Sequence, residues 1–165
     1  MNLQSVHHID HLDQQLVELL AAEPRLAVLE MSRRLGVARA TVQSRLDKLL
    51  QSGVITGFGP DLEPKALGYA VTAFCTIEMT QGKISEVVEP LRAIPEVVEA
   101  HSIAGQGDLF LRIVAQSNDH LMTVLETILQ IPQVDRTSTA IALACQIPYR
   151  TIPLLAGVRS DPPPS

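Results

Sequence analysis

Apolar residues in the first third of the chain repeat at intervals of three and four positions, which is the spacing of one face of an α-helix. One such stripe lies between Asp10, a residue type that caps helix starts, and Pro24, and it consists of Leu12, Leu16, Leu19 and Leu20. The pattern continues over residues 26–35 and again before Gly53, where the stripe consists of Val42, Leu46, Leu49 and Leu50. The sequence therefore predicts three short helices.

The last two of these helices meet at Gly36 with the spacing of a helix-turn-helix. Small Ser32 lies four residues before Gly36, where two helices can cross, and Val42 lies six residues after it and can pack back onto the pair. Glycine tolerates the left-handed conformation that such a turn needs. A helix-turn-helix places its second helix in the DNA major groove. The charges alone fit an ordinary surface hairpin of helices about equally well, so the spacing carries the prediction.

The rest of the chain changes in pattern. Residues 54–62 are short β-type runs broken by Gly57, Gly59 and Pro60, and they predict a small hairpin or wing. We expect a winged helix-turn-helix domain over residues 1–62 and a linker over 63–69. A second domain is expected over 70–148, followed by a tail over 149–165 that is disordered at its end.

From Ala70 the hydrophobic period becomes two, which is typical of a β-strand. Strands are predicted at 70–79, 98–104, 108–115 and 136–145, and helices at 83–93 and 119–130. The order βαββαβ predicts an α+β, ferredoxin-like domain, in which both helices cover one face of a four-stranded antiparallel sheet. The other face would carry Phe74, Phe110 and Val114, and such a face suggests pairing with a second copy of the chain.

Charge is distributed unevenly along the 165 residues. The net charge is −5, which argues against a generally basic nucleic-acid-binding protein, but residues 25–48 carry six basic side chains against two acidic ones. A locally positive helix pair on an acidic body allows one face to approach phosphates.

Other functional classes find little support in the sequence. Cys75 and Cys145 lie in apolar runs without metal-ligand spacing, so both are expected to be buried, and neither a metal nor a cofactor is predicted. The first ten residues are polar, and no apolar run approaches the roughly 20 residues that span a bilayer. We expect a cytoplasmic protein that does not bind membranes.

Five short motifs together resemble the Lrp/AsnC (leucine-responsive regulator and asparagine regulator) family of bacterial and archaeal transcription factors. The likeness runs from about Ile9 to Pro148, and its motifs are Asp10-x-x-Asp13, Leu35-Gly36-Val37, Val42-x-x-Arg45-Leu46-x-x-Leu49, Gly53-Val54-Ile55-x-Gly57-Phe58 and Pro64-x-x-Leu67-Gly68. The resemblance implies a regulator that binds double-stranded DNA and senses an amino acid or a related metabolite. It also implies a ferredoxin-like domain that pairs into homodimers, which often assemble into octamers.

DNA recognition needs hydrogen-bonding side chains for base edges and cations for phosphates. The first two turns of the second helix of the predicted helix-turn-helix offer the candidates for base contacts, Arg39, Thr41, Gln43 and Ser44. The candidates for phosphate contacts are Arg25, Arg33, Arg34, Arg45 and Lys48. Arg45 could instead form a structural pair with Asp13 or Asp47, because arginine favours such pairing. We expect Asp47 to point away from the duplex.

The candidate effector site is a loop between two strands, where glycines let backbone N–H groups face an anion. It consists of Ala104, Gly105, Gln106, Gly107 and Asp108, and the last strand could add the hydroxyls of Thr137, Ser138 and Thr139. The glycines alone fit a plain β-turn better, but the resemblance favours ligand binding. Asp108 could also cap backbone N–H groups of its own turn.

Three positions depart from the family pattern. Gln106 stands where the family commonly has Asp, so one counter-charge for the α-ammonium group of an amino acid is lost. Ala27 and Ala38 stand where the family often has Ser, which removes a helix-capping side chain at each position.

Two other functions are compatible with this architecture. Some proteins of similar build resemble porphyrin-modifying decarboxylases, for which His101, His120 and Arg112 would be the first candidates. The sequence shows no nucleophile and base pair for such chemistry, so we do not expect an enzyme. The other alternative is a ligand-sensing adaptor that has lost DNA binding.

Overall fold

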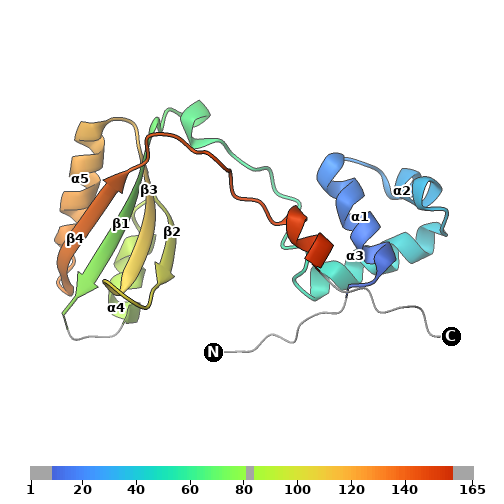
Figure 1. Ribbon diagram of the computed structural model, residues 1–165, viewed down its shortest axis with the longest axis horizontal. Coiled ribbons are helices and arrows are strands. Elements are labelled where there is room, and N and C mark those ends of the chain that lie inside the picture. The colour runs from blue at the N-terminus through green and yellow to red at the C-terminus, as the bar shows by residue number, and fades with distance from the viewer. Residues whose placement is uncertain (1–8, 81–83, 158–165) are drawn as a thin grey trace. The chain divides into compact units, whose positions relative to one another are not determined.

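The computed structural model describes residues 9–80 and 84–157, which divide into two compact units (Figure 1). Unit 1 contains the described residues up to Pro60 together with those from Pro148 onward, and unit 2 contains those of residues 61–147. Among the described residues, no helix is long and apolar enough to cross a membrane. Each unit has its own hydrophobic core.

Unit 1 contains the three predicted helices, α1 (His11–Ala22), α2 (Val28–Leu35) and α3 (Arg39–Gln51). Their apolar stripes meet in a core whose buried members are Leu16, Met31, Val42, Leu46 and Leu49. Helix α1 starts with a capping box, in which Asp10 accepts a hydrogen bond from the backbone N–H of Asp13 and the Asp13 carboxylate accepts one from Asp10. The helical prediction for this part of the chain is confirmed.

The turn between α2 and α3 has the expected geometry. Gly36 adopts the left-handed conformation at φ 66° and ψ 27°, and the backbone N–H of Val37 donates to the carbonyl of Ser32. Ser32 is buried where the helices pack. The N-cap residues Ala27 and Ala38 make no side-chain capping bond, so the first backbone N–H groups of α2 and α3 lack this partner.

One prediction for this part of the chain needs correction. Residues 54–62 form no paired strands. Val54 and Ile55 pack against the helical core, and the glycines and Pro60 that follow lie in an irregular segment, because a short β-type run needs a partner strand to become a strand. In the first part of the expected tail, Ile152–Gly157 forms a 3-10 turn (η2) against α1. The predicted disorder at residues 161–165 lies outside the described residues.

Unit 2 is the ferredoxin-like βαββαβ domain that the alternation predicted. After a 3-10 turn (η1, Pro64–Leu67) come β1 (Val71–Met79), α4 (Ile84–Arg92), β2 (Val97–Ser102), β3 (Leu109–Ala115), α5 (Asn118–Leu129) and β4 (Val134–Ile141). The strands form one antiparallel sheet in the order β2-β3-β1-β4. Both helices cover the same face of this sheet (Figure 1).

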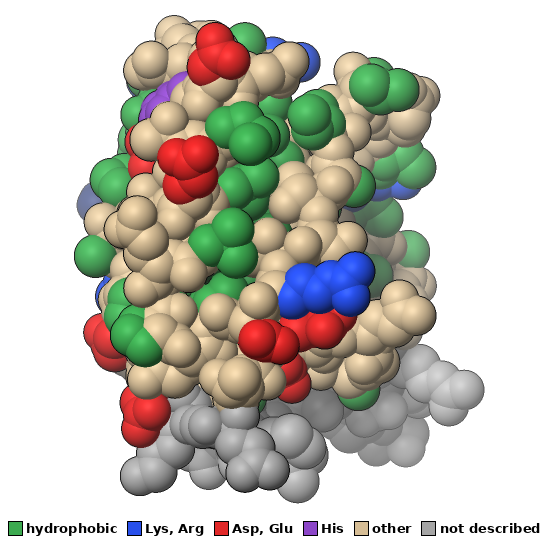
Figure 2. All heavy atoms as spheres, turned by 90° about the vertical axis from the view of Figure 1, so that its left-hand side faces the viewer, with side chains coloured by type: hydrophobic (Ala, Val, Ile, Leu, Met, Phe, Trp, Pro, Cys, Tyr) green, Lys and Arg blue, Asp and Glu red, His purple; other side chains and the backbone are tan. Residues whose placement is uncertain are grey.

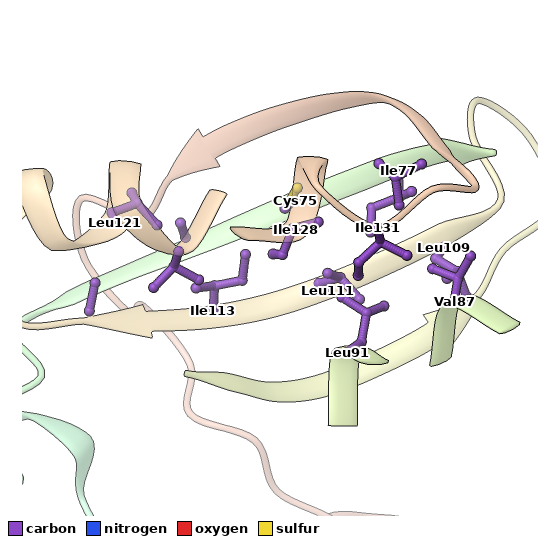
Figure 3. Close-up of a cluster of buried hydrophobic side chains, with 14 residues drawn as sticks. Cys75, Ile77, Val87, Leu91, Leu109, Leu111, Ile113, Leu121, Ile128 and Ile131 are labelled. Atoms are coloured by element: carbon purple, nitrogen blue, oxygen red, sulfur yellow. The ribbon is translucent and has the colours of Figure 1, made fainter. Parts of the chain in front are cut away.

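The core of unit 2 lies between that face and the two helices (Figure 3). Alternate residues of β1 and β3 point into it, and they meet buried residues of α4 and α5 such as Leu91 and Ile128. Cys75 is buried in this core, and burial raises the pKa of its thiol. Cys145 was predicted to be buried as well, but it is exposed, because β4 ends at Ile141 and the chain leaves the sheet before reaching it.

Within the described residues of unit 2, no helix covers the opposite face of the sheet. Phe74 of β1 and Phe110 of β3 stack there with ring centroids 5.6 Å apart. Beside them, Glu99 of β2 lies 2.7 Å from His101 and 3.2 Å from Arg112.

A space-filling view toward β4 and α5 shows hydrophobic side chains interspersed with acidic and uncharged polar ones (Figure 2).

Candidate nucleic-acid interface and effector loop

Helix α3 has a buried face and an open one. Val42, Leu46 and Leu49 point into the core, and the opposite face is a shallow depression lined by Ala40, Gln43, Ser44, Asp47, Lys48 and Gln51. Arg39 is exposed at the first position of the helix, and Thr41 is half-buried beside it. The structure thus brings three of the four proposed base-contact residues, Arg39, Gln43 and Ser44, to the exposed side of one helix.

Asp47 lies on this same open face, and the expectation that it points away from a bound duplex stays a prediction. The amide nitrogen of Gln43 donates a hydrogen bond to a carboxylate oxygen of Asp47 at 2.9 Å. Residues four apart on a helix lie one above the other, so the spacing between Gln43 and Asp47 was the signal for this pair. Sequence reasoning considered each residue separately and missed it.

The proposed phosphate-contact residues differ in their surroundings. Arg25 and Lys48 are exposed, as is Arg39, and no ion pair is found for these three within residues 9–80 and 84–157. Arg33 is 69% exposed and lies 3.6 Å from Glu30, the longest of the arginine–carboxylate separations in unit 1. A loose exposed pair of this kind has little net strength. These cations therefore remain available to a phosphate.

Arg34 is held by two carboxylates. Its guanidinium lies 2.5 Å and 3.2 Å from the two carboxylate oxygens of Glu23 and 3.3 Å from Glu30. The hydrogen bonds from Arg34 lower the pKa of Glu23. Glu23 follows the end of α1 and Glu30 belongs to α2. Arg34 therefore links α2 to the end of α1, and its charge is already paired.

Arg45 forms the structural ion pair with Asp13 that the sequence analysis gave as the alternative to a phosphate contact. Its guanidinium contacts Asp10 and lies 3.0 Å from a carboxylate oxygen of Asp13, whose side chain is fully buried. Burial raises the pKa of Asp10, but hydrogen bonds from the Asp13 backbone N–H and from Arg45 outweigh that effect, and the pKa lies below its ordinary value. Arg45 thus fastens α3 to the start of α1.

The candidate effector loop joins β2 to β3 and is held against β1. Gly105 and Gly107 adopt positive φ angles of 133° and 87°. A Cβ on Gly107 would lie 2.3 Å from the Thr76 methyl and 3.0 Å from the Ile77 carbonyl oxygen, so only glycine fits there. Gln106 is exposed at the tip of the loop.

Asp108 caps a strand rather than its own turn. Its backbone N–H donates to the carbonyl of Ile77 at 2.8 Å, and its carboxylate accepts from the backbone N–H of Met79 at 2.7 Å. Met79 follows a register shift between β1 and β4, and the Asp108 carboxylate gives its N–H a partner. Asp108 therefore has a capping role, but the N–H that it caps belongs to β1, 29 residues away, and not to its own turn.

The three hydroxyl residues of β4 do not form one set. Thr137 and Thr139 pair with Ile77 and Cys75, and Ser138 pairs with Thr76, so the side chain of Ser138 lies on the opposite sheet face from the two threonines. Strand β1 separates β4 from β3, which puts Thr137 about 10 Å from the end of the loop. Among the three, Thr137 lies level with the loop.

Two of the residues suspected of enzymatic chemistry, His101 and Arg112, both contact Glu99, and the third, His120, lies apart from them. His101 lies on the open sheet face with Glu99, whereas His120 lies on α5, which covers the other face, 3.4 Å from Glu96. No group of three or more potential metal ligands is found in the described residues.

Comparison with known proteins agrees with this architecture. A family model for a winged helix-turn-helix DNA-binding domain matches residues 9–56, and a model for the Lrp/AsnC ligand binding domain matches residues 72–151. The regulatory protein AsnC of Escherichia coli is 35% identical over 87% of this chain and 95% of its own length. The HTH-type transcriptional regulator FL11 of Pyrococcus horikoshii is 34% identical over 82% of this chain and 89% of its own.

Solved structures show the same likeness. The structure of E. coli AsnC matches with a TM-score of 0.83 at 33% identity, covering 89% of this chain and 100% of that one. A feast or famine regulatory protein from M. tuberculosis, complexed with L-methionine, matches with a TM-score of 0.77 at 30% identity, covering 86% and 97% of the two chains. The chain therefore belongs to the Lrp/AsnC family of transcriptional regulators.

Proposed function

We propose that α3 is the helix by which this regulator reads DNA, with Arg39, Thr41, Gln43 and Ser44 directed to base edges in the major groove. The observation that carries the proposal is the open face of α3, where polar side chains are flanked by Arg39 and Lys48, two cations without an ion pair in the described residues. Arg25, Arg33 and Lys48 would contact phosphates. Arg34 and Arg45 are committed to carboxylates and hold the helices together.

Binding sites selected from a random duplex library allow this proposal to be tested without knowing the operator. Arg39→Ala should weaken binding to the selected site by about 1–3 kcal/mol and relax the preference at one base position. Lys48→Ala should weaken binding to all sequences and reduce the slope of log affinity against log salt by about one. Arg92→Ala, which removes an exposed cation from α4 of unit 2, is the matched control. Unchanged affinity and preference in both Arg39→Ala and Gln43→Ala would show that α3 is not the reading helix.

We further propose that the loop at residues 104–108 binds an amino acid or a related metabolite, with Thr137 as a hydroxyl contact. Support comes from the M. tuberculosis relative complexed with L-methionine and from the loop of this chain, in which Gly105 and Gly107 adopt positive φ angles. Gln106 is neutral and offers no Coulomb attraction to an ammonium group, so the preferred ligand should depend less on a free α-amine.

A thermal-shift screen of amino acids beside their keto-acid and amide counterparts tests this ligand proposal. At a ligand concentration near one hundred times its dissociation constant, the expected stabilisation is about 2.7 kcal/mol. Gln106→Asp should then favour ligands with an α-amine. Tight binding of an ordinary amino acid to the wild type, with no gain from Gln106→Asp, would show that this position does not select the effector.

The uncovered sheet face supports a homodimer, which could assemble further to an octamer. In the dimer, two copies of α3 would reach major grooves about 34 Å apart, and the operator would be an approximate palindrome. Light scattering of the full chain should give at least a dimer at micromolar concentration, and Phe74→Asp should weaken it; a monomeric wild type would refute the pairing. As a DNA-binding regulator, the protein would act in the cytoplasm and without catalysis.

A further inference from the structure

On the open face of α3, Gln43 and Asp47 form a side-chain hydrogen bond that contributes little to the stability of the fold. Gln43 and Asp47 are both exposed, and their bond at 2.9 Å spans one turn of a helix whose other face is already fixed by Val42, Leu46 and Leu49. Exposed pairs of this spacing add little to helix stability. The bond does, however, set which atoms of Gln43 are left for a ligand.

The chemistry of the two groups fixes the orientation of the amide. An ionised carboxylate only accepts hydrogen bonds, so the amide nitrogen of Gln43 must face Asp47 and its oxygen must face away. A glutamine without such a partner can turn over and present either end. Gln43 therefore offers its oxygen as an acceptor, with its second amide N–H beside it.

We propose that Asp47 is a positioning residue that holds the Gln43 amide ready to read an exocyclic amino group, adenine N6 or cytosine N4, in the major groove. The inference rests on the proposed role of α3. Adenine and cytosine present a donor in that groove, whereas guanine presents only the acceptors N7 and O6, and thymine presents an acceptor and a methyl group. With adenine, the second amide N–H of Gln43 can also reach N7. With guanine, the Gln43 oxygen would face O6, and two acceptors repel.

Site selection with the full chain tests the proposal. The wild type should prefer adenine or cytosine over guanine and thymine by about tenfold at one position of each half-site. Asp47→Ala removes the partner of the amide, and Asp47→Asn replaces it by a group that can donate as well as accept. Both variants should reduce that preference to less than about threefold without a change in melting temperature, and Gln43→Ala should also abolish it. Glu89→Gln, which removes an exposed carboxylate from α4, controls for the change in net charge.

The possible failures are distinguishable. If the preference is lost in Gln43→Ala but persists in both Asp47 variants, Asp47 does not position the amide, and α3 remains the reading helix. If the preference survives Gln43→Ala and disappears in Asp47→Ala, the carboxylate reads the base directly, and the positioning role is overturned. A wild-type preference for guanine or thymine at this position also overturns it. If no variant of Arg39, Gln43 or Asp47 alters the selected sites, the proposed role of α3 fails as well.

Discussion

Replacing Arg45 by Met separates a structural role from a DNA-contacting one. The change keeps the apolar part of the side chain but removes the guanidinium that contacts Asp10 and Asp13. Asp13 is fully buried, and without Arg45 its carboxylate would keep the hydrogen bond from the backbone N–H of Asp10 at 3.3 Å but no cation. A buried carboxylate that loses its cation destabilises the folded state strongly.

The expected size of the loss follows from these contacts. Breaking a buried ion pair on one side costs about 3–5 kcal/mol, and a buried hydrogen bond to a charged group contributes about 1.5–3 kcal/mol. The Arg45 side chain is itself 29% exposed, so water can partly replace it, and we expect about 2–3 kcal/mol. For a domain of this size, that corresponds to a fall in melting temperature of roughly 10–20 °C.

Calorimetry of the full chain can measure this loss in unit 1. Arg33→Met is the matched control, because the Arg33 side chain is 69% exposed and 3.6 Å from its nearest acid, so its replacement should cost less than about 0.5 kcal/mol. Below the transition, Arg45→Met should bind selected DNA with an unchanged salt slope. Equal melting temperatures for the two variants, or a salt slope reduced by about one in Arg45→Met, would refute the structural assignment and restore the phosphate contact.

Three further predictions concern stability. Ala38→Ser should supply the missing cap of α3 and stabilise unit 1 by about 1 kcal/mol, measured by chemical denaturation. Gly107→Ala should destabilise unit 2 by more than Gly105→Ala does, because both have positive φ but only the first meets backbone within 3.0 Å; equal losses would exclude the steric cause. The pKa of Asp10 is lower in the folded state than in the unfolded one, so its ionised carboxylate stabilises unit 1 above the unfolded pKa, and this stabilisation is lost as pH falls through the folded pKa. Unit 1 should therefore lose stability below about pH 4, and the loss should be smaller in Asp10→Asn.

The helices and strands were predictable because their signal is local. Leu16 and Leu46 belong to stripes of period 3.6, and Ala73, Cys75 and Ile77 to an alternation of period two, so each buried face could be derived from neighbours in the sequence. The irregular segment at residues 54–62 shows where such reasoning fails. Its composition is that of strands, but a strand also needs a partner at the right place, and composition does not specify one.

The contacts of the site residues are likewise of two kinds, those between neighbours in the sequence and those between residues far apart in it. The bond between Gln43 and Asp47 spans four positions on one helix, and a local rule could have found it. The partner of Asp108 is the N–H of Met79, 29 residues away, and the contact of Arg45 with Asp10 spans 35 residues. A carboxylate or a guanidinium carries the same charge whether it meets a ligand or the protein, so its sequence context alone could not distinguish the two. Only the fold shows that Arg45 is already paired, whereas Arg39 and Lys48 are exposed and have no ion pair within the described residues.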